Sequence, residues 1–180
     1  TEPFLQFLAW VLSEGHVRSH SVHISQNEGD NANRIRAILN NLGIKYTEKT
    51  RMVVSELARK DLTPKPRVSF DIYSKMLAQY VHQFGHYSTD KHLLPYIKQF
   101  PKKVLRNFIY EYILGDGYLP RKWIYTGSVR MFNDLIEVGL KSGYGVNVLG
   151  YDEDRNHYTI KLLETKKEVQ IRPDDVHKIN

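Results

Sequence analysis

The strongest constraint on the fold is an internal repeat. Two apolar segments, FLAWVLSEG at residues 7–15 and IYEYILGDG at residues 109–117, both end in a small residue, an acid and glycine. Each is followed by a strand-like segment and then by an amphipathic helix that a glycine closes. The motif glycine and the closing glycine are 28 positions apart in the first half and 26 in the second. Such matched long-range order predicts two similar halves.

Hydrophobic periodicity and capping residues assign most of the remaining chain to short elements. We expect helices at residues 3–14, 31–42, 75–84, 102–115 and 129–142, the third and the last capped by Ser74 and Ser128. We expect strands at residues 17–25, 50–54, 67–73, 123–127, 146–151, 157–163 and 167–172. Trp10, Trp123 and most of the tyrosines are expected in the core.

Composition narrows the classes of function. The chain has 180 residues, no cysteine, a net charge of +6 and a pI of about 9.4. The absence of cysteine excludes disulfides, thiolate metal sites and cysteine nucleophiles, and it fits an intracellular protein. Neither a membrane-spanning run nor a secretory leader is visible. The basic surplus favours a polyanionic partner such as nucleic acid.

With these motifs in this order, the chain resembles the LAGLIDADG homing endonucleases, particularly their two-motif, intein-type group. The resemblance covers nearly the whole chain, including RIRAILNNLGIKY at residues 34–46 and YTGSVRMFNDLIEVGLKSG at residues 125–143. It implies an α+β, pseudo-twofold fold of two αββαββ-like halves, with antiparallel saddle sheets around two central helices. We place the first subdomain at residues 1–90, a connector at 91–101 and the second subdomain at 102–180.

Glu14 and Asp116 are the candidate catalytic acids. A carboxylate at the C-terminal end of a helix faces the negative end of the helix dipole, so its placement there favours a bound cation. Two such carboxylates offer the oxygen ligands that Mg²⁺ prefers. The resemblance implies Mg²⁺ or Mn²⁺, with the backbone carbonyls of Ser13 and Gly115 as further ligands. The alternative is that Glu-Gly and Asp-Gly are ordinary helix ends.

Basic residues near the acids are the next candidates. By resemblance, Lys91 matches the lysine that precedes the second motif in the family, and its ammonium can stabilise charge on a scissile phosphate. The alternative for Lys91 is a solvated linker side chain. Lys161 is the candidate counterpart in the second half, with Arg121 behind it, although both suit phosphate contacts better.

Outward-facing polar residues of the strands are expected to contact DNA, because the family's saddle sheets lie in the major groove. Such side chains can bond base edges or phosphates. The set is Arg18, His20, His23, Ser25, Gln26, Lys49, Arg51, Arg67, Ser69, Asp71, Arg121, Lys122, Tyr125, Asn147 and Lys161. Glu111 departs from the family pattern, since a small residue is usual there; it must be paired, hydrated or close to a cation.

The resemblance and the retained acids together imply a monomeric, metal-dependent endonuclease that cuts a long, asymmetric double-stranded DNA site. Two alternatives remain open: an intron RNA maturase, or a DNA-binding protein on the same fold that does not cleave. The chain also resembles the endonuclease part of a larger intein, to which a splicing domain would be joined. We see no splicing nucleophile in the chain itself.

Overall fold

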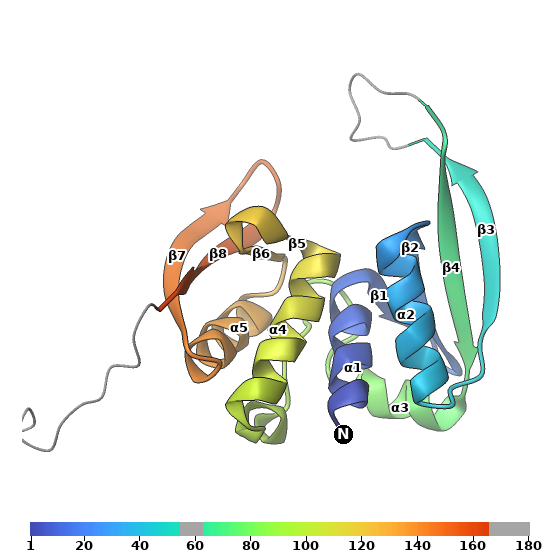
Figure 1. The fold of residues 1–180 in the computed structure, drawn as a ribbon, viewed down its shortest axis with the longest axis horizontal. Coiled ribbons are helices and arrows are strands. Elements are labelled where there is room, and N and C mark those ends of the chain that lie inside the picture. The colour runs from blue at the N-terminus through green and yellow to red at the C-terminus, as the bar shows by residue number, and fades with distance from the viewer. Residues whose placement is uncertain (55–62, 166–180) are drawn as a thin grey trace, which may run out of the picture.

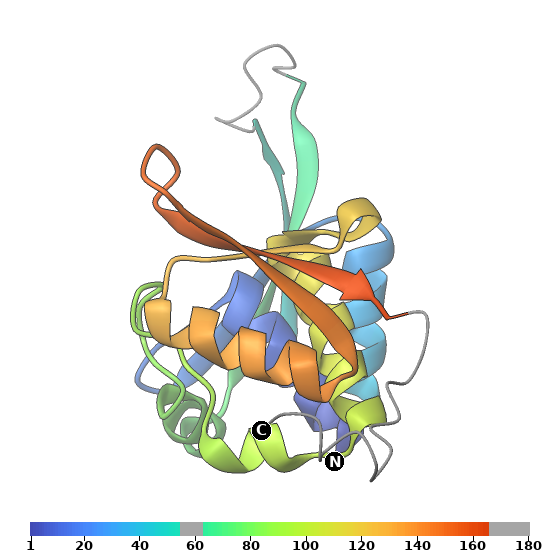
Figure 2. The ribbon, with the colours of Figure 1, turned by 90° about the vertical axis from the view of Figure 1, so that its left-hand side faces the viewer.

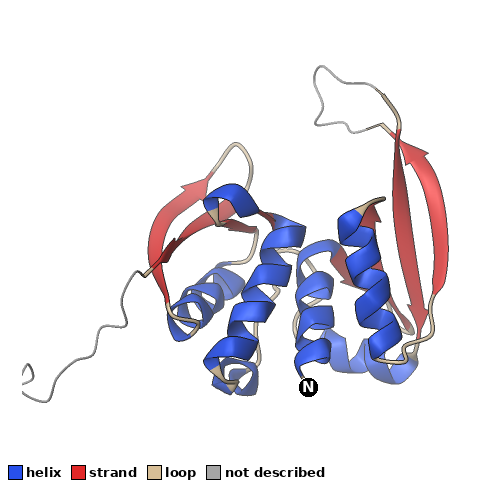
Figure 3. Ribbon diagram, in the orientation of Figure 1, coloured by secondary structure: helices blue, strands red, loops and turns tan. Residues whose placement is uncertain are grey.

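The computed structural model describes residues 1–54 and 63–165, which form two four-stranded antiparallel sheets with helices (Figures 1 and 3). The strand expected at residues 167–172 lies outside the described residues. In Figure 3 the helices occupy the middle of the molecule and the sheets flank them. The α+β class expected from the sequence is therefore confirmed.

The first half follows the predicted order of elements. It contains α1 (Glu2–Glu14), β1 (Gly15–Val17), β2 (Ser21–Asn27), α2 (Asp30–Asn41), β3 (Thr47–Val53), β4 (Lys65–Tyr73) and α3 (Lys75–His82). Its sheet has the strand order β1-β2-β4-β3. The Ser74 side chain caps α3 by accepting a hydrogen bond from the Leu77 amide, as expected.

The second half repeats this topology. After a 3₁₀ turn, η1 (Pro95–Gln99), it contains α4 (Lys102–Asp116), β5 (Gly117–Tyr118), a second 3₁₀ turn, η2 (Leu119–Arg121), β6 (Trp123–Thr126), α5 (Val129–Lys141), β7 (Tyr144–Asp152) and β8 (His157–Glu164). The strand order β5-β6-β8-β7 matches that of the first sheet. Figure 2 shows β7 and β8 passing over α5. The internal repeat is therefore a repeat of structure.

Helices α1 and α4 lie side by side at the centre of the molecule (Figure 1). Two faces of α1 enter two different cores: Leu5 and Leu8 pack with α4 and the second half, whereas Phe7 and Trp10 pack with the first sheet. This double burial explains why α1 is apolar almost all round.

Glu111 lies in this helix interface, fully buried. Its carboxylate accepts hydrogen bonds from the Trp10 indole at 2.9 Å, from Gln6 at 3.2 Å and from Arg34 Nε at 2.7 and 2.8 Å. Arg34 extends from α2, so the pair also ties α2 to α4. The sequence left open whether this carboxylate is paired, hydrated or close to a cation, and in the structure it is paired with the Arg34 guanidinium.

The expectation that most tyrosines are core residues is wrong. Of the 12 tyrosines, only Tyr112 and Tyr144 are buried, although Trp10 is fully buried as expected and Trp123 is half-buried. A tyrosine has an apolar ring and a polar tip, so it remains stable at a surface. Several of these exposed rings belong to the strands that flank the central helices.

Candidate functional site

The C-terminal ends of α1 and α4 meet at one point, and Glu14 and Asp116 are their last residues. A Cβ atom on Gly115 would lie 2.7 Å from Ser13 Cβ and 3.2 Å from Glu14 Cγ. Only a residue without a side chain permits this approach of the two backbones. The structure therefore brings together the four residues predicted as metal ligands.

The motif glycines do not act as ordinary helix stops. Such a stop is usually a left-handed glycine, but Gly15 has φ −103° and Gly117 has φ −160°, both extended. Each helix passes directly into a strand, β1 or β5. A Cβ on Gly15 would lie 2.7 Å from the Val11 carbonyl oxygen, and one on Gly117 would lie 2.5 Å from that of Trp123. These glycines are required by close backbone contact, which fixes the direction of the preceding acid.

The two acids are held in an environment that disfavours their charge. Burial, and next the charge of Asp116, raise the pKa of Glu14 to about 7, although Arg67, Gln26 and Lys91 act in the opposite direction. Burial raises the pKa of Asp116 to about 6, against the effect of Lys91. Carboxylates whose charge is poorly compensated are well suited to bind a hard cation.

Lys91 lies beside both acids. Its ammonium donates hydrogen bonds to the Leu12 carbonyl at 2.7 Å and to the Gly15 carbonyl at 3.1 Å, at the end of α1. Burial lowers the pKa of Lys91, while the charges of Asp116 and Glu14 partly offset this effect. Lys91 is therefore not a solvated linker side chain.

The backbone around Lys91 is held from two sides. The Ser128 hydroxyl, at the start of α5, donates to the Lys91 carbonyl at 2.6 Å, and the His92 amide donates to the Phe84 carbonyl at 2.9 Å. A Cβ on Gly85, whose φ is +103°, would lie 2.7 Å from the carbonyl oxygen of Asp90. The segment that follows α3 is thus packed tightly enough to place the lysine at the acids.

Gln26 lies on the opposite face of β2 from the one that we predict from the sequence. It was expected on the outward face of its strand with Ser25, but neighbouring strand residues point to opposite faces. Gln26 is buried on the helix-facing side of β2 and donates to Glu14 Oε1 at 3.4 Å. The alternation with Val22 and Ile24, both buried, was the signal that could have placed it there.

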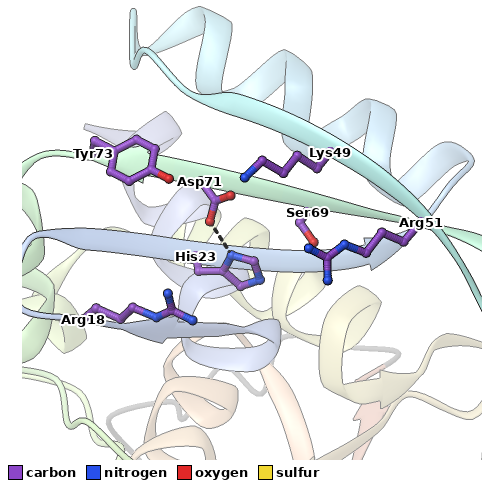
Figure 4. Close-up of a pocket in the computed structure, with 7 residues that line it drawn as sticks. All are labelled: Arg18, His23, Lys49, Arg51, Ser69, Asp71 and Tyr73. Carbon is purple, nitrogen blue, oxygen red and sulfur yellow. Dashed lines mark hydrogen bonds and ion pairs between the residues drawn. The ribbon is translucent and has the colours of Figure 1, made fainter.

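Most of the predicted DNA contacts in the first half do share one face of its sheet. Arg18, His23, Lys49, Arg51, Ser69 and Asp71 line a hollow of about 340 Å³, together with Tyr73, which the sequence analysis missed (Figure 4). Within it, His23 Nδ1 and Asp71 Oδ1 are 2.7 Å apart. We call the outward side of the strands in each sheet, opposite the helices, the groove face of that sheet.

Other predicted contacts in the first half lie around this hollow. Ser25 is paired with Ser69 across β2 and β4, and its hydroxyl accepts from Arg67 Nε at 2.8 Å. Arg67 Nη2 also lies 3.9 Å from Glu14 Oε2, so it links the groove face to the acid pair. His20 is exposed in the turn between β1 and β2, where its ring contacts the Ser19 hydroxyl, and it does not line the hollow.

In the second half, Lys161 pairs with Trp123 and Asn147 across its strands. Tyr125 lies on the same face, since its neighbour Ile124 is buried. The charge of Lys91 lowers the pKa of Asp116. The strand pairing places Lys161 on the groove face of the second sheet.

The two basic residues that precede β6 have partners within the chain. Arg121 lies over the Trp123 ring, with its guanidinium carbon 5.1 Å from the ring centroid. Lys122, in a left-handed conformation with φ 51°, forms an ion pair with Glu164. Arg121 remains exposed at the edge of the groove face.

The donor set fits a hard divalent cation. It consists of two carboxylates and two backbone carbonyl groups, at a point where charge is poorly compensated. Within residues 1–54 and 63–165 there is no group of three or more His, Cys, Asp and Glu side chains that could hold a metal. Ligation through this site would therefore be completed by oxygens from water or from a substrate.

Comparison with known proteins supports the fold. No protein-family model matches the chain, and no curated protein matches it. Among solved structures, it is similar to I-DmoI in complex with DNA and Mn, with a TM-score of 0.58 and 15% identity over 89% of each chain. It is also similar to the homing endonuclease I-WcaI bound to its DNA recognition sequence, with a TM-score of 0.61 and 10% identity over 90% of this chain and 75% of that one.

A third similar structure is the full-length DUF199/WhiA protein from Thermatoga maritima. Its TM-score is 0.57 at 11% identity, and the match covers 92% of this chain but only 51% of that one. The chain thus has the LAGLIDADG homing endonuclease fold, which also occurs in a protein whose name describes no nuclease.

In the described part of the chain, no helix has the length and apolar character needed to cross a membrane.

Proposed function

We propose that this chain is a site-specific endonuclease that hydrolyses phosphodiester bonds of double-stranded DNA with Mg²⁺ or Mn²⁺. The observation that carries the proposal is the meeting of Glu14 and Asp116, both with raised pKa values, beside the partly buried Lys91. Raised carboxylate pKa values together with a specific charged partner mark a candidate functional site. The DNA-bound state of I-DmoI and I-WcaI supports the choice of substrate.

In this proposal Glu14 and Asp116 would hold the ion, with the carbonyls of Ser13 and Gly115 as further ligands. A bound divalent ion neutralises phosphate charge and lowers the pKa of water. Lys91 has three ammonium hydrogens, of which two point to backbone carbonyls. The third has no acceptor within residues 1–54 and 63–165, so it can donate to a phosphate oxygen and stabilise the negative charge that develops during hydrolysis.

The groove faces hold the duplex on either side of the acids. Arg18, Lys49, Arg51 and Arg67 are exposed on the first sheet, where they suit contacts with phosphates or guanine edges. The two halves are parts of one chain and differ in sequence, so we expect a non-palindromic target and a monomeric enzyme.

The second candidate is a protein that binds nucleic acid without cutting it, either DNA or intron RNA. The similarity to the DUF199/WhiA protein favours it, because that match shows the fold outside the homing endonucleases. The retention of an acid in both halves favours the endonuclease. A role within a larger intein remains a separate proposal, since residues 166–180 lie outside the described residues.

A cleavage assay separates these candidates. The protein is incubated with a randomised duplex DNA library and Mg²⁺, and cut ends are sequenced. We expect cutting at a defined site, and we expect Glu14→Gln and Asp116→Asn to lose cutting but to retain binding. Glu153→Gln, in the exposed turn between β7 and β8, is the control. Full cleavage by Asp116→Asn would overturn the catalytic assignment, whereas tight binding without cutting by the unaltered chain would support the second candidate.

A further inference from the structure

The two groove faces carry different chemistry at equivalent positions. The buried pairs Ile24–Phe70 and Ile124–Ile160 occupy the same place in the two sheets, next to the motif glycines. The strand residues beside them therefore correspond as well. His23, Ser25, Ser69 and Asp71 in the first sheet match Trp123, Tyr125, Thr159 and Lys161 in the second. Hydrogen-bonding side chains at two of these positions are thus replaced by large aromatic rings.

A β-bulge adds a further apolar side chain to the second face. The register of β7 and β8 shifts between Val148 and Gly150, and Gly150 has φ +95°, a conformation that glycine adopts readily. The extra residue, Leu149, is 49% exposed. It lines a hollow of about 220 Å³ together with Trp123, Tyr125 and Thr159, and the polar side chains of Asp152, Arg155 and His157 lie at the same hollow. The first sheet has Lys49 and Arg51 along the corresponding strand, where they line its own hollow.

The aromatic rings of this face have neighbours within the chain, which cover one face of Trp123 and crowd Tyr125 at a tilt. The Arg121 guanidinium lies over Trp123, and the His157 ring lies 4.8 Å from that of Tyr125. Stacking of unpaired bases needs open ring faces. These contacts leave fewer open ring faces for stacking, whereas the ring edges and the Leu149 side chain can still meet a duplex groove.

We infer that the second sheet reads thymine 5-methyl groups in the major groove, so that its half-site is rich in A·T pairs, whereas the first sheet reads its half-site by charge and hydrogen bonds. The thymine methyl is the apolar feature of the major groove, and apolar side chains recognise it. This inference rests on the proposed function, because it requires that both groove faces contact duplex DNA.

Methyl removal tests the inference directly. Bound duplexes are first selected from a randomised pool with the full chain, in Ca²⁺ to prevent cutting, and the consensus site is synthesised. Thymine is then replaced by uracil in one half-site at a time, which removes the methyl and keeps base pairing. We expect affinity to fall about fourfold per contacted methyl in the half-site under the second sheet. In the other half-site we expect no change.

Variants assign the effect to this face. Leu149→Ser should weaken binding to the thymine-containing site and abolish the difference between thymine and uracil. Tyr125→Ser, which installs the residue that the first sheet has at position 25, should act in the same direction. Leu140→Ser is the matched control, because it removes a similarly exposed leucine from α5. It should keep both the affinity and the methyl effect.

The other possible outcomes of these binding measurements would overturn the inference, the proposed function or both. Equal uracil effects in both half-sites, or no effect in either, would overturn the inference while the proposed DNA binding stands. A methyl effect that survives Leu149→Ser and Tyr125→Ser would also overturn it. If the pool yields no bound duplex, or if the chain prefers single-stranded RNA, the proposed function fails first and the inference fails with it.

Discussion

Replacing Glu14 by glutamine should stabilise the metal-free protein at pH 8 while it abolishes cleavage. In the folded state the pKa of Glu14 is about 7, above its ordinary value of 4.5, mainly because of burial and the charge of Asp116. The native state therefore binds the proton more tightly than the unfolded state does. The contribution of Glu14 to the free energy of unfolding is therefore fully present below about pH 4.5 and is lost as the pH rises to about 7. Glutamine has no charge to bury, so it avoids this loss.

The size of the gain follows from the same numbers. The difference between about 7 and 4.5 corresponds to roughly 3 kcal/mol at pH 8, since one pKa unit is about 1.36 kcal/mol. The Glu14 side chain keeps 24% of its surface exposed, and water reduces the penalty. We therefore expect a gain of about 1–2 kcal/mol, or roughly 3–6 °C in Tm for a chain of this length.

Thermal unfolding in EDTA at pH 8 and at pH 4 measures this gain. Glu14→Gln should unfold at a higher temperature than the unaltered chain at pH 8 and at nearly the same temperature at pH 4. Added Mg²⁺ should then stabilise the unaltered chain but not the variant. Glu153→Gln, on the exposed hairpin turn, should change neither value. A variant that is less stable at pH 8, or a gain that persists at pH 4, would refute the electrostatic account of the acid pair.

Three further predictions concern the helix interface and the lysine. Gly115→Ala should destabilise the fold by about 1–3 kcal/mol in urea unfolding, because the new Cβ meets Ser13, and Ser13→Gly should restore part of the loss. Arg34→Met should lower the free energy of unfolding by about 2–4 kcal/mol, because it leaves Glu111 buried without its cation. A further Glu111→Gln change should restore most of that free energy. A loss below about 0.5 kcal/mol in Arg34→Met would contradict this pairing. Lys91→Met should lower the cleavage rate about 100-fold or more with DNA affinity unchanged, and unaltered single-turnover rates would exclude the proposed role.

The sequence predicted those features that depend on local rules. The two acid-Gly motifs, the serine caps and the alternation of Val68, Phe70 and Ile72 each follow from the geometry of one helix end or one strand. The matched order of these elements was enough to predict two similar halves. Their strand orders confirm it, since four strands are arranged alike in both sheets.

Local rules could not place features that depend on tertiary packing. Lys91 was a candidate through the family resemblance alone, because it is 25 positions from Asp116 along the chain, and the packing of the segment after α3 against α5 brings its ammonium to the acids. The prediction that most tyrosines are buried is wrong, because a large ring can stay at the surface when its hydroxyl group can reach water. Gln26 was misplaced because its polarity was given more weight than the alternation of its strand.

The two halves remain alike where backbone contact demands it and diverge where it does not. A side chain at Gly15 or Gly117 would collide with a backbone carbonyl, and one at Gly115 would collide with Ser13, so these positions tolerate no change without movement of the helices. No such collision constrains the groove faces, where the position of Asp71 in one sheet is held by Lys161 in the other. Because each sheet is encoded separately, its face is free to suit a different sequence. Two acids at equivalent positions are therefore compatible with an asymmetric DNA target. The difference between the two groove faces, rather than any difference between the motif helices, would determine the sequence of that target.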